Sequence, residues 1–294
     1  MVDVSGRDLN RRQFLKTGLA LAAGVATLGP ARVFGQDRDE CTRWAFLSDT
    51  HVASDPDNKY RGFYPYQNLQ EVTGQLAYCP PDGVVITGDL ARMRGQVEAY
   101  ENLKTLLMPV AAQRPLYLGL GNHDTRDDFS QAFATDVGDV RTVEDRHVVT
   151  AVAGPMRLIV LDTLLADRAA GLLGGAQRMW LNSFLATTDD RPTILFCHHR
   201  PRIDLLDTKR LFDIIGPVAK VKAVVYGHSH RFHFSQYRGI HLINLPATGY
   251  NMSDSQPVGW VEANLTERGG EFTLHAIGGN RKHDGSCVRL IWRS

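Results

Sequence analysis

Val224-Val225-Tyr226-Gly227-His228-Ser229-His230 is a short apolar run that ends in a glycine and two histidines. The pattern predicts a buried strand that runs into a tight turn. Because residues two apart in an extended segment point to the same side, His228 and His230 are expected to face one site together. Histidines also occur in ordinary loops and strand ends, so this stretch alone is a weak indication of function.

Four upstream stretches have the same design, an apolar run followed by residue types that bind metals. They are Phe46-Leu47-Ser48-Asp49-Thr50-His51, Val84-Val85-Ile86-Thr87-Gly88-Asp89, Tyr117-Leu118-Gly119-Leu120-Gly121-Asn122-His123-Asp124 and Ile194-Leu195-Phe196-Cys197-His198-His199. In open α/β sheets, ligands bind outside the carboxyl ends of the strands. We therefore expect the polar ends of these stretches to meet at one edge of a sheet.

The order of elements predicts the fold class. Strands at 43–48, 84–87 and 116–120 alternate with helices at 66–78 and 96–112, which indicates parallel α/β units. The remaining ranges follow the same periodicity rules. Further strands are expected at 147–152, 157–161, 193–197, 223–226, 241–245, 259–265, 271–276 and 287–291, with helices at 129–134, 176–187 and 206–215. In the helix at 176–187, Met179, Trp180 and Phe184 are expected to face inward. The first helix should bury Leu69, Val72 and Leu76.

The polar strand ends supply oxygen and imidazole donors and no thiolate. The set is Asp49, His51, Asp89, Asn122, His123, Asp124, His198, His228 and His230. Such donors suit two metal ions such as Mn, Fe or Zn rather than a cysteine-bound structural zinc. A carboxylate such as Asp89 could bridge two ions about 3.5 Å apart, the arrangement used for in-line attack on phosphorus.

These five blocks resemble the calcineurin-like binuclear metallophosphoesterase family, whose motifs are Asp-x-His, Gly-Asp, Gly-Asn-His-Asp, a later His, and Gly-His-x-His. All occur here in order between residues 49 and 230. The forms Ser48-Asp49-Thr50-His51 and Cys197-His198-His199 are most similar to the cyclic-nucleotide and glycerophosphodiester phosphodiesterase branch. The resemblance implies a four-layer α/β/β/α sandwich with mixed sheets.

The resemblance also implies roles for the residues. Asp49, His51 and His230 would hold one metal, Asn122, His198 and His228 the other, and Asp89 would bridge them. His123 would act as the acid facing the leaving oxygen, with Asp124 orienting its ring. A metal-bound hydroxide would then hydrolyse phosphodiester or phosphomonoester bonds of small organic phosphates. Whether His198 or His199 is the ligand stays open.

One motif departs from the family. The phosphodiesterase branch usually has His-His-Pro-Pro, whereas this chain has His198-His199-Arg200-Pro201. Arg200 could bind a substrate phosphate through both arms of its guanidinium, or it could be a solvated loop residue. Asp162 and His199 are candidates for contacts behind the metal ligands. Tyr60, Phe63, Tyr64 and Tyr66 could line a substrate pocket, but the favoured interpretation is that they pack their own loop.

The first 35 residues predict export. Arg11-Arg12-Gln13-Phe14-Leu15-Lys16 and the Ala- and Gly-rich run after it resemble a twin-arginine signal peptide, read by the twin-arginine export machinery. A basic amphipathic helix is the alternative. The apolar run is too short and Gly-rich for a stable membrane span. We expect one domain over residues 36–294, located in the periplasm or outside the cell.

The net charge and the cysteines bear on which classes of function are expected. Removing residues 1–35 takes five of the 33 Lys and Arg residues and two of the 32 Asp and Glu residues, so the net charge changes from +1 to −2. A nuclease is therefore disfavoured and no nucleic-acid partner is expected. A non-catalytic metal- or phosphate-binding module is the other alternative. Cys197 is expected to be a buried thiol, and the pairing of Cys41, Cys79 and Cys287 is undecided.

Overall fold

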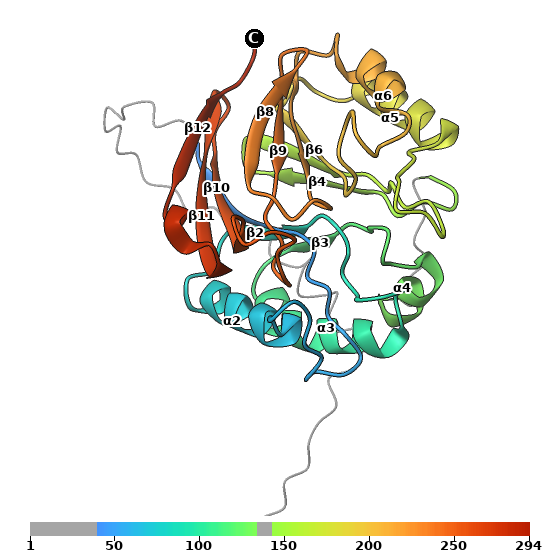
Figure 1. Cartoon of the computed structure of the whole chain (residues 1–294). Helices are drawn as coiled ribbons and strands as arrows, with labels where there is room; N and C mark the ends of the chain where they lie inside the picture. Colours follow the sequence, from blue (N-terminus) through green and yellow to red (C-terminus); the bar gives the residue numbers. More distant parts are fainter. Residues whose placement is uncertain (1–39, 134–142) are drawn as a thin grey trace, which may run out of the picture.

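The computed structural model describes residues 40–133 and 143–294. In this part of the chain, two six-stranded sheets pack face to face and helices cover their outer faces (Figure 1). The expected signal peptide at 1–35 and Ala134, the last residue of the expected helix 129–134, lie outside the described residues.

The first sheet joins the N-terminal strands to the C-terminal ones. Its order is β12-β11-β10-β1-β2-β3. The strands are β1 (Thr42–Leu47), β2 (Gly83–Ile86), β3 (Leu116–Leu118), β10 (Pro257–Leu265), β11 (Gly269–Gly279) and β12 (Cys287–Ile291). Strands β1, β2 and β3 run parallel, as the alternation with helices predicts, while β10, β11 and β12 add antiparallel neighbours.

The second sheet contains the middle of the chain. Its order is β4-β5-β6-β7-β9-β8. The strands are β4 (Val149–Ala153), β5 (Met156–Val160), β6 (Thr193–Phe196), β7 (Val221–Tyr226), β8 (His233–Tyr237) and β9 (Ile240–Asn244). The inner strands β5, β6, β7 and β9 are parallel, and the edge strands β4 and β8 are antiparallel. Both sheets are thus mixed. The β8 strand, mostly exposed, is absent from the strands predicted by apolar periodicity.

Helices on the outer faces of the two sheets form two further layers. They are α2 (Pro65–Tyr78), α3 (Val97–Ala111), α4 (Arg126–Phe133), α5 (Gly175–Thr187), α6 (Thr208–Ile215) and a short 3-10 turn, η1 (Arg281–His283). Residues of α2 and α3 share one apolar cluster with β1 and β2, whereas α5 and α6 share another with β6 and β7. The described domain is an α/β/β/α sandwich, which confirms the expected fold.

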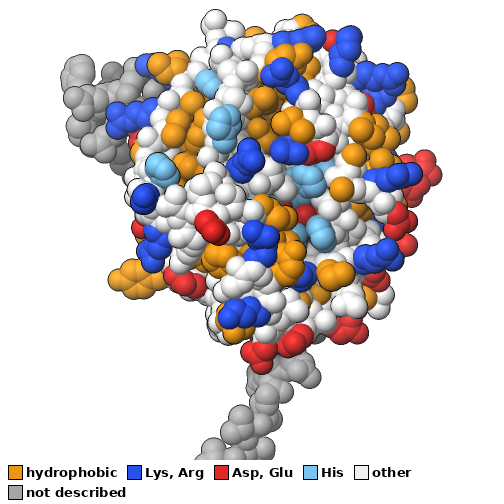
Figure 2. Space-filling view, viewed as in Figure 1, with side chains coloured by type: hydrophobic (Ala, Val, Ile, Leu, Met, Phe, Trp, Pro, Cys, Tyr) orange, Lys and Arg blue, Asp and Glu red, His pale blue; other side chains and the backbone are white. Residues whose placement is uncertain are grey.

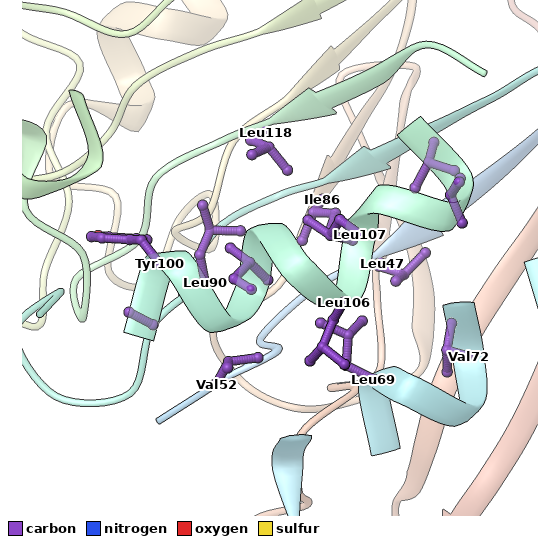
Figure 3. Packing of buried hydrophobic residues seen from close by; sticks show 14 of the residues in the cluster. Leu47, Val52, Leu69, Val72, Ile86, Leu90, Tyr100, Leu106, Leu107 and Leu118 are labelled. Atoms are coloured by element: carbon purple, nitrogen blue, oxygen red, sulfur yellow. The ribbon is translucent and has the colours of Figure 1, made fainter. Parts of the chain in front are cut away.

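Strand alternation sorts side chains between the layers. In β1, Leu47 points to the helices α2 and α3, and Phe46 points into the space between the sheets. Figure 3 shows the helix side of this arrangement, with Leu107 of α3 beside Ile86 and Leu106 beside Leu69 of α2. Between the sheets, Phe46 meets Phe196 of β6 edge to face at 4.9 Å. These apolar layers fix the positions at which β1 and β6 end.

The buried face of α2 agrees with prediction, but that of α5 does not. Leu69, Val72 and Leu76 are buried, as expected. Met179 is 69% exposed, so the expectation that it faces inward is wrong. Trp180 and Phe184 are half-buried against the cluster beneath α5. At 3.6 residues per turn, Met179 projects about 100° away from Trp180, and the sheet covers only part of that arc.

Cys197 is buried and free, as predicted, and Cys41, Cys79 and Cys287 are exposed and free. No disulfide therefore forms among these four described cysteines. None of the helices in residues 40–133 and 143–294 combines the length and apolar character needed to cross a bilayer.

Candidate metal centre

The expected ligands leave their strands through unusual backbone conformations. Asp49, His51, Asp89, His228 and His230 all have positive φ, between 47° and 66°. Side chains with a Cβ rarely adopt this region, and it costs of order 1 kcal/mol or more per residue. Strain of this kind gathers where structure is maintained for a site rather than for packing. The five residues share it although they come from three separate segments.

Two glycines let these segments approach one another. A Cβ on Gly227 would overlap Ser48 Oγ and a carboxylate oxygen of Asp49. A Cβ on Gly121 would lie 2.5 Å from the backbone nitrogen of Asp89 and 2.8 Å from Cδ2 of His198. Only glycine fits where backbone and ligand side chains come this close.

One carboxylate oxygen of Asp49 has no hydrogen-bond partner in the site. Its Oδ2 accepts hydrogen bonds from Ser48 Oγ at 2.5 Å and from the backbone nitrogen of His228 at 3.0 Å. Its Oδ1 is buried with no hydrogen-bond partner and lies 3.2 Å from His230 Nε2. One half of the carboxylate is therefore anchored, and the other half is available as a ligand.

His51 and His230 complete this group. Their Nε2 atoms face each other at 3.2 Å, and ligand atoms of Asp49, His51 and His230 all lie within 4.8 Å of one another. His230 Nδ1 donates to the backbone oxygen of Tyr250 at 2.5 Å. In the neutral ring this hydrogen bond leaves Nε2 with its lone pair toward Asp49. A partner on the far nitrogen is typical of a metal-ligating histidine.

Asp89 lies between the two groups of histidines. Its Oδ1 accepts a hydrogen bond from the backbone nitrogen of His123, which fixes the carboxylate. Its Oδ2 lies 3.7 Å from His51 Nε2 and 3.2 Å from His198 Nε2. One oxygen thus faces histidines from both sides, the position that a bridging carboxylate requires.

The second group contains Asp89, His198 and His228, whose ligand atoms also lie within 4.8 Å of one another. Asn122 lies between Gly121 and His123, which both approach Asp89, and its Oδ1 is buried without a hydrogen-bond partner. His228 Nε2 lies 3.4 Å from Oδ2 of Asp204, a residue of the loop between β6 and α6.

The neighbouring His198 and His199 have different surroundings. Both ring nitrogens of His198 are buried and lack hydrogen-bond partners, and Nε2 faces Asp89. His199 Nδ1 is paired with Thr163 Oγ1 at 2.8 Å, and its ring lies 5.1 Å from those of His198 and His228. His199 therefore lies behind the cluster that includes His198.

His123 and Asp124 lie on opposite sides of their turn. The His123 side chain is half-buried, and its ring meets the His51 ring edge to face at 4.9 Å. Asp124 is buried and accepts hydrogen bonds from the backbone nitrogens of Leu90, Ala91 and Gly121 and from the Tyr100 hydroxyl. Among the described residues, no hydrogen bond joins its side chain to the His123 ring, so the expected orienting contact is not seen. Asp124 instead ties the Gly-Asp and Gly-Asn-His-Asp turns together.

The charges of the cluster compete. Burial alone would raise the pKa of Asp49, yet His230 and His198 hold it below its usual range. Burial opposes charge on His198, but Asp89 and Asp49 outweigh it and raise its pKa to about 9. Burial lowers the pKa of His51 to about 3. Neutral imidazole and ionised carboxylate are the forms that bind metals.

The donors at this edge fit a pair of metal ions. Buried polar atoms are normally hydrogen-bonded, and a buried unpaired one costs about 1–3 kcal/mol. Asp49 Oδ1, Asn122 Oδ1 and His198 Nε2 are all buried and unpaired within one cluster. Bound cations would satisfy these acceptors, and oxygen and imidazole donors without thiolate suit Mn, Fe or Zn.

Several uncertain residues now have defined positions. Arg200 pairs with Asp204, Nε to Oδ2 at 2.6 Å, so its guanidinium is neither simply solvated nor directed alone at a phosphate. Asp162 forms a two-armed ion pair with Arg126 and does not contact the cluster. Of the aromatic residues near position 60, Tyr60 contacts Tyr250, while Tyr66 packs against the core beneath α2.

Sequence reasoning missed three neighbours of the cluster. Asp204 contacts His228, Ser48 holds Asp49, and the Tyr250 ring lies 4.7 Å from His51 and 4.8 Å from His230. Ser48 lies beside a predicted ligand and could have been considered on that ground. No pattern distinguishes Asp204 or Tyr250, because loops bring them to the cluster from positions outside the motifs.

The pattern of calcineurin-like phosphoesterases matches residues 42–232, the stretch that carries every residue of this cluster. The chain belongs to the calcineurin-like phosphoesterase family. It is an ester-bond hydrolase of this class, and the family uses a binuclear metal centre. The expectation of a metallophosphoesterase is confirmed.

Similar proteins are phosphodiesterases. A cAMP/cGMP dual specificity phosphodiesterase of Mycobacterium tuberculosis is 34% identical over 69% of this chain and 66% of its own length. A glycerophosphodiester phosphodiesterase of Enterobacter lignolyticus is 29% identical over 69% of this chain and 76% of its own length. A dimetal phosphatase of Danio rerio, 14% identical, covers 86% of this chain and all of its own with a TM-score of 0.67, so the two share a fold.

The N-terminus matches a second pattern. Residues 8–28 fit the signal sequence of the twin-arginine translocation pathway. The chain is therefore exported across the membrane, as expected, and the twin-arginine machinery is the partner that this signal implies.

Proposed function

We propose that the protein hydrolyses phosphodiesters of small organic molecules at a centre of two metal ions. The position of Asp89 carries the proposal. Its Oδ2 faces His51 on one side and His198 on the other, so a single carboxylate joins two groups of three ligands. The phosphodiesterase relatives support a diester rather than a monoester as the substrate.

Each half of the centre would take one ion of Mn, Fe or Zn. We assign one half to Asp49, His51 and His230 and the other to Asn122, His198 and His228, with Asp89 shared. When bound, the metal pair would supply positive charge to the phosphoryl oxygens and lower the pKa of a water molecule toward about 7. Asp49 and Asp89 keep their orientation through hydrogen bonds to their outward-facing oxygens.

His123 is proposed to donate a proton to the leaving oxygen. Its backbone nitrogen is held by Asp89, and its ring lies against His51 at the half-buried side of the cluster. A substrate bound at the metal centre would therefore meet this imidazole first. General acid catalysis of this kind contributes about 10²–10⁴-fold to rate. Asp124 positions His123 through the backbone rather than through its ring.

The test uses the mature protein reconstituted with Mn, Fe or Zn and assayed on an aryl diester, the matching monoester and cyclic nucleotides. We expect the diester to be hydrolysed fastest, with metal analysis giving two ions per chain. Asp89→Asn should abolish turnover and reduce the bound metal. Asp190→Asn, a change in a fully exposed aspartate, is the matched control and should leave both unchanged.

Other results of this assay would indicate other functions. Bound metal without turnover on any ester would identify a non-catalytic binding module and contradict the proposal. Cleavage of single-stranded DNA faster than the small diester would identify a nuclease.

Maturation is a separate proposal. We infer that residues 1–35 are removed on export and that residues 36–294 act as one domain. The mass of the exported protein would place the cleavage site. A protein that keeps its N-terminus after export would contradict this inference.

A further inference from the structure

Arg92 lies three residues after Asp89 and stacks on Tyr60. Its guanidinium carbon is 3.7 Å from the Tyr60 ring centroid and 5.7 Å from the Tyr250 ring centroid. An aromatic ring thus lies directly against one side of the guanidinium group. Stacking of this kind orients an arginine and leaves its donors free.

A chain of ring contacts connects Arg92 to the metal centre. Tyr60 meets Tyr250 edge to face at 4.7 Å, and Tyr250 stacks on His51 at 4.7 Å. The backbone is fixed as well, because the Arg92 nitrogen donates to the Val52 oxygen at 2.8 Å. The guanidinium is therefore held in place, with the rings of Tyr60 and Tyr250 between it and the candidate ligand His51. Figure 2 shows basic and histidine side chains together on one face of the molecule.

The donors of Arg92 have no protein acceptor. Within residues 40–133 and 143–294, its side chain has neither a hydrogen bond nor a carboxylate partner, although it is half-buried. Other half-buried arginines differ: Arg126 pairs with Asp162 and Arg178 with Asp207. The Tyr250 hydroxyl likewise lacks a hydrogen bond in the described chain, although the residue is only 3% exposed. Two side chains with unpaired donors thus lie near one another, since the Arg92 guanidinium carbon is 5.7 Å from the Tyr250 ring centroid.

We propose that Arg92 and Tyr250 form a subsite for an anionic group, a carboxylate or second phosphate, on the alcohol part of the substrate. This inference rests on the proposed function, since the metal centre would hold the phosphodiester while the subsite reads what is attached to it. A guanidinium edge matches a carboxylate or phosphate in two-armed geometry, and such charged hydrogen bonds are about twice as strong as neutral ones. The covered face excludes stacking of a substrate ring on the Tyr60 side.

A matched pair of substrates tests the subsite. p-Nitrophenyl ethyl phosphate and p-nitrophenyl 2-carboxyethyl phosphate release the same nitrophenolate and differ by one carboxylate. With the metal-loaded wild-type protein, we expect kcat/KM to be higher for the carboxylate substrate by about tenfold or more. Arg92→Gln should remove this preference by raising KM for the carboxylate substrate. It should leave kcat/KM for the ethyl substrate within about twofold of wild type. Arg92→Lys should keep part of the preference.

Arg94→Gln is the control, because Arg94 is an exposed arginine of the same loop. Arg94→Gln should retain the full preference for the carboxylate substrate. Thermal unfolding should show that Arg92→Gln is folded. If Arg92→Gln lowers kcat/KM equally for both substrates, or leaves the preference intact, the proposed subsite is overturned. The proposed phosphodiesterase function is not affected by that result. If neither diester is hydrolysed by the wild-type protein, the proposed function itself fails.

Discussion

Asp204 Oδ2 lies 3.4 Å from Nε2 of His228, and the same oxygen accepts a hydrogen bond from Arg200. Asp204 also accepts from the backbone nitrogen of Arg200, so both oxygens of the carboxylate are fixed. Where a histidine binds a metal through one ring nitrogen, a carboxylate on the other nitrogen orients the ring and makes it a better donor. Arg200, the departure from the family motif, thus helps to position the residue behind a proposed ligand.

Asp204→Asn should therefore weaken binding of the metal that we assign to His228. Losing such a carboxylate typically costs about 10- to 100-fold in metal affinity or activity. We expect metal analysis after dialysis to fall from two ions per chain toward one, with turnover reduced in parallel. Asp213→Asn removes a partly exposed aspartate that also pairs with an arginine, Arg238, and should change neither value. Full retention of both metals in Asp204→Asn would contradict the positioning role.

Gly227→Ala should damage the centre by steric overlap. The added methyl would overlap Ser48 Oγ and Asp49 Oδ2, and overpacking of this kind costs about 1–3 kcal/mol. We expect a lower free energy of unfolding and loss of metal binding. Gly74→Ala in α2 meets no atom within 4 Å and should stabilise the protein by up to about 1 kcal/mol. Urea unfolding of the two variants beside wild type measures both effects.

Removing the metals should lower the melting temperature. Ions present at 100 times their Kd stabilise the native state by about 2.7 kcal/mol, which corresponds to roughly 5–10 °C for a chain of this size. Scanning calorimetry with and without a chelator checks this shift. In Asp89→Asn the chelator should have a smaller effect, because fewer ions are bound at the start. An equal shift in both proteins would indicate that the stabilising metal lies elsewhere.

Phe196→Ala tests the contact between the sheets. Phe196 is fully buried and packs against Phe46, so its loss should cost about 3–5 kcal/mol of unfolding free energy. Met179→Ala, a change on the exposed side of α5, should stay within about 0.5 kcal/mol of wild type. Equal effects of the two changes would argue against the central apolar layer. Denaturant unfolding measures both.

Sequence patterns predicted most of the architecture, because buried parallel strands are short apolar runs. The stretches ending at Asp49, Asp89 and His228 were identified for that reason, and their strands lie in the two sheets as expected. The bounds of the exposed strand β8 were not predicted, because alternating burial is weak in a strand at the sheet edge. Met179 was misplaced because helical periodicity gives a direction but not the width of the buried arc.

The surroundings of the centre were less predictable. Motifs place residues that neighbour one another along a strand end, whereas Asp204 and Tyr250 reach the cluster from loops whose paths depend on the whole fold. Arg92 is close to the Gly-Asp motif in sequence, but only the structure shows that Tyr60 covers its face. Long-range contacts of this kind carry no local pattern.

The positive φ angles of Asp49, His51, Asp89, His228 and His230 have a consequence for divergence. Each strained residue costs of order 1 kcal/mol, and glycine or asparagine would relieve that cost at the same position. A duplicated copy that no longer binds metal would lose the stability that bound ions supply, and it would recover part of it by replacing the proposed ligands with unstrained residues. For this fold, we therefore expect these five positions to diverge early in any copy that has lost its function.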